Sequence, residues 1–422
     1  MSLVTPRKGY KSVPWLFGKE IEIPQEWEVK KINELAKVNS EQINNDFKYD
    51  EIEYVDISSI EQFQITKLDK YSTSERPSRA QRIIKNKDII ISTVRPYMKS
   101  FSLVHLNKPN LICSTGFTVV QSKINSDTNF LFNYFKSYLF ESNYFRKMEG
   151  MAYPAITSSV VSNSLILIPN DKKEREKIAT ILSNVDNLIE STGQVIETSK
   201  RVKTGLMQKL LTRGIGHTKF KKVPWLFGKE IEIPQEWEIK KLKESCTVRQ
   251  GLQIPISDRF TEDGKNRFQY ITVKAIHSNK FNEYVENPSE RVICTTEDIL
   301  FTRTGNTGEI ITDIKGVFHN NFFLVDFDKR QLFKEFLIIS LKQHKIQGMI
   351  KSLAGTTTIP DLNHGDFFRL QIIIPPLPEQ QKIATILSNI DSKITSQEQY
   401  KEKLEKLKKS LMQKLLTGEV RV

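Results

Sequence analysis

Cysteine is scarce in this sequence, and long hydrophobic runs are missing from it. The chain of 422 residues has three cysteines, Cys113, Cys246 and Cys294, which are odd in number and far apart. That pattern excludes a disulfide framework and a cysteine-based metal site, and it suits a reducing compartment such as the cytoplasm. No apolar run approaches the roughly 18 residues that cross a bilayer, and residues 1–10 lack the apolar core of a signal peptide. We therefore expect a cytoplasmic protein without a membrane segment or a metal site.

Common catalytic motifs are absent as well. The sequence has no Asp/Asn-Pro-Pro-Tyr/Phe motif, which excludes the usual adenine methyltransferase site, and no G-x-x-x-x-G-K-[ST] phosphate loop, which excludes the usual ATP-driven motor. The segment Gly305–Gly308 is rich in glycine, but no lysine–hydroxyl pair follows it. The six histidines are scattered without the spacing of metal ligands. These absences predict that the chain carries no catalytic residue and binds no cofactor.

The chain is strongly basic. Its formal net charge is +13 and its isoelectric point is about 9.3. A cation of this size attracts polyanions, so nucleic acid is the leading partner. Charge alone does not decide the matter, because many basic proteins bind only other proteins. A basic interaction scaffold therefore stays open as the alternative.

The sequence repeats itself with a period near 205 residues. A sixteen-residue segment, which we call box A, reads VPWLFGKEIEIPQEWE in both of its copies. Two later segments, KIATILSN and LMQKLLT, also recur. The copies lie at Val13–Glu28 and Val223–Glu238, at Lys177–Asn184 and Lys382–Asn389, and at Leu206–Thr212 and Leu411–Thr417. This period is too long for a solenoid and indicates a duplicated pair of domains.

Between the repeated segments lie two regions, residues 37–169 and 247–375, that share little sequence but keep the same landmarks. Ile89-Ile90-Ile91 corresponds to Ile299-Leu300-Phe301, and Ile166–Pro169 corresponds to Ile372–Pro375. Short β-branched and aromatic runs broken by Gly, Asn and Pro predict strands, and the apolar stretches 130–145 and 332–347 predict one late helix in each region. We therefore expect two mixed α+β domains with a common scaffold and divergent loops. The divergent loops would recognise two different targets.

Two long helices are predicted, over Asp171–Arg213 and Leu377–Thr417. Apolar residues recur there in alternating steps of three and four, and Gly214 and Gly418 follow as C-terminal caps. A helix of about 40 residues extends roughly 60 Å, too far for one small domain to cover. We expect the two helices to pair antiparallel as a coiled coil, since equivalent copies meet most simply about a two-fold axis. The alternative is that each helix packs on its own domain.

All four tryptophans of the chain lie in the two copies of box A. Tryptophan is often an anchor of cores or interfaces. We interpret box A as a strand and turn that tie each domain to the far end of a helix and close the molecule circularly. Docking of a partner protein is the alternative for this segment.

The arrangement resembles the specificity subunit of type I restriction–modification enzymes over essentially the whole chain. The resemblance is carried by the duplication, by Ile-Pro-Gln-Glu-Trp-Glu at 23–28 and 233–238, by DILFTRTGNTG at 298–308 and by PPLPEQQKIA at 375–384. The first copy departs from the pattern with Ile-Pro-Asn-Asp-Lys at 168–172 and Ser-Thr-Val-Arg-Pro at 92–96.

This resemblance implies a non-catalytic DNA-binding subunit with two target recognition domains, which recognise a bipartite, asymmetric site in double-stranded DNA. It implies two methylation subunits and two restriction or motor subunits as partners, which would bring S-adenosylmethionine, ATP and Mg²⁺. The division that it implies is residues 1–170 for the first recognition domain with its box at 13–38, 171–213 for the first spacer helix, 214–376 for the second recognition domain with its box at 223–248, and 377–422 for the second spacer helix.

Base reading requires Arg, Lys, Asn or Gln on short loops, and phosphate anchoring requires cations and hydroxyls. In the first domain the predicted DNA-binding residues are Arg76, Arg79, Arg82, Arg95, Tyr97, Lys99 and Tyr153. In the second domain they are Arg249, Gln250, Gln253, Arg303, Thr304, Asn306, Thr307, Thr356, Thr357 and Thr358. Arg303 is the strongest candidate, because it follows a predicted strand and enters a turn flanked by glycine.

Overall fold

The computed structural model describes residues 6–147, 154–355 and 360–422. The chain forms two compact units, one made of residues 1–194 and 398–422 and the other of residues 195–397. Two long helices, α5 (Lys172–Arg213) and α10 (Leu377–Leu416), each begin in one unit and end in the other. Both helices match the predicted ranges to within one residue at each end. None of the described helices combines the length and the hydrophobicity that a bilayer crossing requires.

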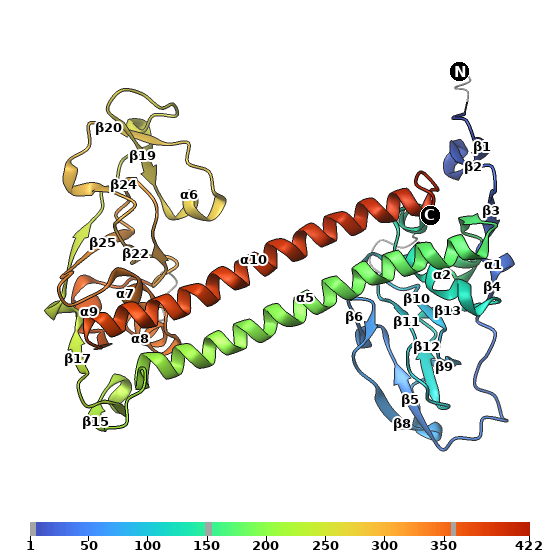
Figure 1. The fold of residues 1–422 in the computed structure, drawn as a ribbon, viewed down its shortest axis with the longest axis horizontal. Helices are drawn as coiled ribbons and strands as arrows, with labels where there is room; N and C mark the ends of the chain where they lie inside the picture. The colour runs from blue at the N-terminus through green and yellow to red at the C-terminus, as the bar shows by residue number, and fades with distance from the viewer. Residues whose placement is uncertain (1–5, 148–153, 356–359) are drawn as a thin grey trace. The chain divides into compact units, whose positions relative to one another are not determined.

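The first unit contains two four-stranded sheets, in the orders β11-β10-β13-β4 and β8-β5-β12-β9 (Figure 1). Ile89 and Ile91 of β10 enter one hydrophobic core, and Ile90 enters the other, so this strand is buried on both faces. The strands are β4 (Ala36–Val38), β5 (Glu51–Val55), β8 (Asp69–Ser72), β9 (Ala80–Ile83), β10 (Ile89–Ser92), β11 (Phe101–Leu103), β12 (Leu111–Ser114) and β13 (Phe117–Ser122), with a small hairpin of β6 (Ile60–Glu61) and β7 (Gln64–Ile65).

Two helices cover the outer face of the first sheet, α2 (Thr128–Phe135) and α3 (Tyr138–Arg146). The single helix that we expected over residues 130–145 is therefore wrong. The break occurs at Ser137, whose hydroxyl donates to the Tyr134 carbonyl at 2.6 Å and accepts from the Phe140 amide at 3.5 Å. A serine that bonds to nearby backbone groups competes with the helical hydrogen bonds and starts a new helix. Short helices α1 (Ile32–Leu35) and α4 (Ser158–Ser162) complete the unit.

The second unit repeats this topology with different residues. Its sheets have the orders β18-β25-β22-β23 and β20-β19-β24-β21, and each unit has one parallel strand pair, β5 with β12 and β19 with β24. The landmark strands β10 and β22 therefore correspond, as the sequence predicted. The strands are β18 (Cys246–Gln250), β19 (Arg267–Ile271), β20 (Tyr284–Glu286), β21 (Ile293–Cys294), β22 (Leu300–Thr302), β23 (Ile310–Ile311), β24 (Gly316–Phe318) and β25 (Phe322–Phe327).

The second unit also has two helices where one was expected over residues 332–347. They are α7 (Lys334–Leu341) and α8 (His344–Ala354), and they separate at Lys342 and Gln343. Residue Gln343 has extended backbone angles, which no helix can pass through. The remaining helices of this unit are α6 (Val273–Ser278) and α9 (His364–Arg369). The shared plan of both units confirms the predicted α+β fold class with a common scaffold.

The long helices pair antiparallel within each unit. In the first unit Ile178 and Leu182 of α5 share a core with Leu415 of α10. In the second unit Leu210 of α5 shares a core with Ile383 of α10. In each case the end of one helix meets the start of the other, which confirms the predicted antiparallel pairing.

Two ion pairs show that this pairing is reciprocal. Asp186 pairs with Lys408 in the first unit, and Lys203 pairs with Asp391 at 2.5 Å in the second. The two aspartates occupy equivalent positions 205 residues apart, and so do the two lysines. A contact between i and j that recurs between the copies of j and i is the mark of a two-fold relation. The two copies of the helix therefore use one set of contacts twice.

Each copy of box A forms a hairpin followed by a strand that joins the end of its recognition region. The first copy comprises β1 (Tyr10–Pro14), β2 (Glu20–Pro24) and β3 (Trp27–Lys31), and β3 pairs with β14 (Leu165–Pro169). The second comprises β15 (Phe220–Pro224), β16 (Glu230–Pro234) and β17 (Glu238–Lys241), which pairs with β26 (Gln371–Ile374). The predicted single strand and turn is thus a larger element.

A tryptophan of each box fastens the two helix ends together. Trp27 donates its indole N–H to Glu174 of α5 at 3.3 Å, and Trp237 donates to Glu379 of α10 at 2.9 Å. Each ring lies against the glycine that follows the other helix, since a Cβ on Gly418 would be 3.3 Å from Trp27 and one on Gly214 would be 2.6 Å from Trp237. The Tyr10 hydroxyl also donates to the Gly418 carbonyl at 2.9 Å. The first box therefore meets the end of the second helix, as the sequence predicted.

We expect Gly214→Ala to lower the free energy of unfolding by about 2 kcal/mol, through strain at positive φ and overpacking. Gly214 has a φ of +65°, and its added Cβ would lie 2.5 Å from the Glu379 carboxylate. Urea denaturation of the full chain measures the effect. The matched control is Gly205→Ala inside α5, where an added Cβ would have no atom within 4 Å, and it should raise the free energy of unfolding by up to about 1 kcal/mol. Equal effects of the two variants would contradict the proposed fastening.

Candidate nucleic-acid interface

One loop occupies the same place in both units, directly after β10 and β22. In each unit three backbone hydrogen bonds fix this loop, one to the turn before β13 or β25 and two to the segment that follows the late helices. In the second unit they run from the Arg303 amide to Asn321, from Leu362 to the Arg303 carbonyl and from Gly305 to Pro360. In the first unit the same bonds run from Thr93 to Gly116, from Ile156 to Thr93 and from Arg95 to Pro154. The backbone frame is thus common to both loops, and only the side chains on it differ.

Arg303, the strongest candidate from the sequence, is held by Asp361. Its Nε donates to Oδ1 at 3.0 Å and its Nη2 donates to Oδ2 at 2.8 Å. Thr304 donates its hydroxyl to the same carboxylate at 2.5 Å. The Arg303 hydrogen bond, together with that from Thr304 and against the opposing effect of burial, lowers the pKa of Asp361. This pairing uses one side of the guanidinium and leaves Nη1 without a described partner.

The rest of the loop divides into a half-buried support, Thr307, and an exposed tip, Asn306. Thr307 donates its hydroxyl to the carbonyls of Arg303 and Pro360, at 2.9 and 3.0 Å, so it fastens the loop. Asn306 lies at the exposed tip, 3.2 Å from His277, whose ring pairs with Glu309 at 3.0 Å. Asn306 thus presents a side chain that can both donate and accept, which base edges require.

The end of β18 carries the other candidates of the second unit. Arg249 donates to Asp326 at 2.9 Å and to the Arg291 carbonyl at 3.1 Å. Gln250 is exposed, and Gln253 accepts a hydrogen bond from Asn320 at 3.1 Å. The structure therefore brings Arg303, Thr304, Asn306 and Thr307 together on one loop, while Arg249, Gln250 and Gln253 lie on a separate strand end.

The arginine cluster of the first unit, Arg76, Arg79 and Arg82, places its three members in different surroundings. Arg82 lies on β9 with Nε and Nη1 buried, and no described residue bonds to either atom. Burial lowers the pKa of its guanidinium. Arg76 donates to the Thr73 carbonyl at 2.6 Å, and Arg79 is exposed. Arg79 is consequently the member of the cluster best placed to meet a phosphate.

Arg95, Tyr97 and Lys99 lie on one tight turn. Arg95 and Lys99 both have positive φ, at 49° and 52°, and they flank a single 3₁₀ turn. Tyr97 is 53% exposed at its tip, and Lys99 pairs with Glu141 at 2.5 Å. Four candidates, Tyr153, Thr356, Thr357 and Thr358, lie outside the described residues.

Sequence reasoning missed the carboxylates that hold the arginines, Asp361 and Asp326. These acids lie 58 and 77 residues from their partners, so no local pattern connects them. One signal was available, because Asp361 follows a proline near the end of its region, where the first copy has Ala155 after Pro154.

Two α+β units with one strand order, different loop side chains and a shared antiparallel helical pair define a duplicated recognition module. Residues 24–199 and 234–406 match the family described as the type I restriction modification DNA specificity domain. Because the match covers most of the chain, the protein belongs to this family, that of type I restriction–modification specificity subunits.

Two curated relatives come from Methanocaldococcus jannaschii. The chain is 26% identical over 434 residues to the type I restriction enzyme MjaVIII specificity subunit, and 27% identical over 417 residues to the putative type I restriction enzyme MjaX specificity subunit. Each alignment covers 95% of both proteins. A solved structure concerned with complex assembly and conformational transition of the type I restriction–modification system matches with a TM-score of 0.58 at 21% identity, over 94% of this chain and 99% of that one. This last likeness supports the fold.

Proposed function

We propose that this chain chooses the DNA target of a restriction–modification complex and performs no chemistry itself. In this proposal each unit reads one half of a bipartite, asymmetric site in double-stranded DNA. The observation that carries the proposal is the common backbone frame of the two loops. The same frame presents Arg303 and Asp361 in one unit, and Thr93 and Ala155 at the equivalent positions of the other. Equivalent frames with different side chains suit two different half-sites.

The long helices would set the gap between the half-sites. Each helix runs without interruption, over 42 residues in α5 and 40 in α10. Helical backbone resists bending because every turn is hydrogen-bonded. A DNA-binding protein whose two halves are related by a two-fold axis binds half-sites centred about one turn of DNA apart, roughly 10 bp.

The partners in this proposal are two methylation subunits and two restriction subunits in the cytoplasm. S-adenosylmethionine would bind to the methylation subunits, and ATP and Mg²⁺ to the restriction subunits, so this chain would bind no cofactor. Membership of the family supports a place in such a complex. The reciprocal contacts of the helices support a pair of identical partners, because two equivalent surfaces accept two equivalent proteins.

A basic scaffold that binds proteins but no specific DNA is the second candidate. The net charge of +13 favours it as much as it favours a reader. The divergence of the two loops on one backbone frame does not favour the scaffold, because a scaffold for identical partners gains nothing from different loops.

Methylome sequencing of the host strain tests the proposal. We expect one methylated motif that depends on this chain, with two unlike half-sites separated by a fixed run of unspecified bases. Deletion of the gene is the control and should remove that motif alone. A palindromic or continuous motif would contradict two unlike readers at a fixed gap. If deletion of the gene removes no methylated motif although the methylation subunit is present and active, the result favours the scaffold.

A further inference from the structure

The tip of the second hairpin presents a large aromatic side chain to solvent. Phe227 lies between β15 and β16 and is 56% exposed. Its backbone angles, φ 58° and ψ 29°, fall in the left-handed region. A bulky residue adopts this conformation only at a cost in free energy, and such strain collects at functional sites. Solubility alone would favour glycine or asparagine here, so the aromatic ring requires a reason.

The tip is anchored on both sides of this residue. Trp225 and Leu226 are buried in the core of the second unit, at 7% and 5% exposure. The Trp225 amide donates to the Lys229 carbonyl at 2.7 Å, which closes the turn. The Lys345 ammonium of α8 lies 5.3 Å from the centroid of the Trp225 ring. Because its neighbours are fixed, Phe227 is held outward as a rigid projection, which lowers the entropy lost on binding.

The first copy of box A has the same four residues at its tip, Trp15-Leu16-Phe17-Gly18. Packing accounts for the repeated tryptophan and leucine, which are buried in the second unit and half-buried in the first. It does not explain why phenylalanine is kept at the tip, since Phe227 is 56% exposed in the second unit. The recognition loops have diverged, so an element that stays the same in both copies meets the same partner twice.

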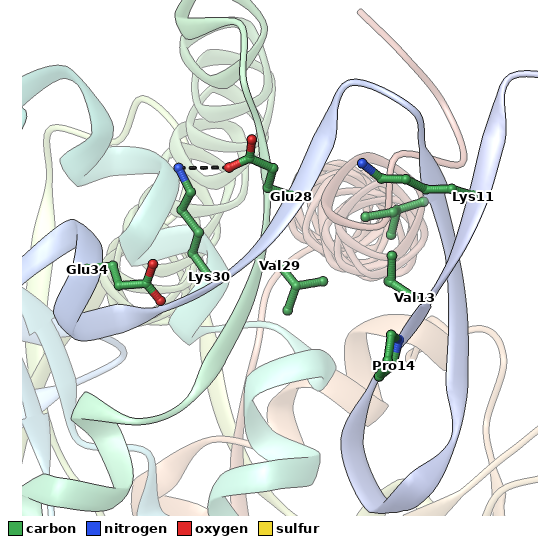
Figure 2. A pocket seen from close by; sticks show the side chains of 8 residues that line it. Lys11, Val13, Pro14, Glu28, Val29, Lys30 and Glu34 are labelled. Carbon is green, nitrogen blue, oxygen red and sulfur yellow. Dashed lines mark ion pairs between the residues drawn. The ribbon is translucent and has the colours of Figure 1, made fainter.

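The surface beside the hairpin is repeated as well. A hollow of about 410 Å³ lies beside the first hairpin. Figure 2 shows Val29 beside the ion pair of Lys30 with Glu28, and Val13 on the facing strand. Seven of the hollow's eight lining residues recur 210 positions later in the sequence, and isoleucine replaces Val29. The ion pair also recurs, between Lys240 and Glu238 at 3.1 Å. The repeated surface thus extends beyond the tip.

The charges near the tip favour a protein over DNA. Lys229 and Glu230 are exposed, and Glu232 is paired with Arg213 at 3.1 Å. Carboxylates next to a wedge that enters DNA would lie close to phosphates and repel them. Mixed charge around one aromatic anchor is instead typical of protein interfaces, in which a few aromatic residues carry most of the binding energy.

We propose that Phe227 inserts into an apolar pocket on one methylation subunit, and that the identical tip at residues 15–18 addresses the second copy of that subunit. This inference rests on the proposed function, because it names the surface through which the chain would hold its methylation partners.

The test uses Phe227→Gly in the full chain with the purified methylation subunit of the same host. Glycine accepts the positive φ without strain, so the variant should keep or raise the melting temperature of the chain. We expect the dissociation constant of one of the two binding events to rise roughly 30-fold. The double variant Phe17→Gly, Phe227→Gly should weaken both events. The control is Ile256→Ser, which removes an apolar side chain that is 79% exposed in the same unit, and it should change neither event.

A photo-crosslinking amino acid in place of Phe227 gives a second measurement that does not depend on affinity. Crosslinks to the methylation subunit in the assembled complex support the inference, and crosslinks to DNA overturn it. If the natural chain binds the methylation subunit and Phe227→Gly binds within twofold of it, the inference is wrong and the proposed function stands. If the natural chain binds no methylation subunit at all, the proposed function is overturned, and the inference with it.

Discussion

The double variant Arg303→Ala, Asn306→Ala will lose discrimination at one half-site and keep it at the other. Arg303 and Asn306 keep hydrogen-bonding capacity for DNA, since Asp361 occupies only one side of the Arg303 guanidinium and the exposed Asn306 amide has a single described contact, with His277. The other side of the guanidinium can donate two parallel hydrogen bonds to guanine, and the amide of asparagine can donate to and accept from adenine. We expect discrimination at that half-site to fall roughly 10- to 100-fold, because one good base contact contributes about 1–3 kcal/mol.

The measurement is competition between oligonucleotides altered in one half-site or the other, with the assembled methylation complex at fixed salt. Gly305 and Gly308 are left unchanged, because both have positive φ and a Cβ on Gly308 would lie 2.9 Å from Gln347. The control is Arg330→Ala, which removes the same charge from a side chain that is 91% exposed. Equal loss at both half-sites, or a loss that the control reproduces, would show that this loop supplies charge and no base reading.

Asp186→Asn should be the most destabilising of the substitutions that we consider, at about 3 kcal/mol for the first unit. Asp186 bonds to Lys136 at 2.6 Å and also to Lys408, whose side chains are 6% and 17% exposed. Asparagine would leave two buried ammonium groups without a counter-charge. Hydrogen–deuterium exchange of peptides from α2 at pH 7 measures the loss of stability in this unit.

The control is the same substitution at Asp391, the copy of Asp186 in the second half of the repeat. Asp391 occupies the equivalent position, but it is 50% exposed and pairs with a single lysine, Lys203, which is 30% exposed. Exposed pairs contribute little, so Asp391→Asn should cost less than about 1 kcal/mol in the second unit. Similar effects at the two positions would contradict the view that burial decides the cost.

The same cluster gives a pH dependence. Burial, with Lys408 adding to it and Asp186 opposing it, lowers the pKa of Lys136 to about 8. The unfolded chain therefore binds more protons than the folded chain between about pH 8 and the ordinary lysine value near 10.4, so stability should rise with pH in that window. Burial opposes ionisation of Asp186, but its two lysine partners outweigh burial and lower its pKa. The contribution of Asp186 to the stability of the first unit is therefore present above about pH 4, and it is lost as the pH falls through the pKa of Asp186 in the folded chain.

Repetition and periodicity within the sequence were enough to predict the duplicated plan, the two long helices and their antiparallel pairing. Repetition and periodicity can be read directly from the sequence, so no knowledge of distant contacts was needed. The break between α2 and α3 was missed because apolar periodicity continues across Ser137, and only the competing hydrogen bonds of its hydroxyl reveal it.

The candidate site was predictable in place but not in detail. The loop at Arg303 could be located from a strand followed by a glycine-flanked turn. Its ion pair with Asp361 could not, because the partner is supplied by a segment that only the folded backbone brings alongside. The same holds for Arg249, whose guanidinium bonds to Asp326 on a neighbouring strand.

The first unit is built from two segments that lie on either side of the second unit in the sequence. The second unit consists of one uninterrupted stretch, residues 195–397, whereas the first also needs residues 398–422. Every residue of the second unit is therefore synthesised before the last segment of the first unit. The first must wait with Trp27 and Leu182 uncovered until Leu415 and Leu416 emerge. A prematurely terminated chain would thus expose apolar surface in its oldest part, where chaperones and proteases recognise unfinished proteins.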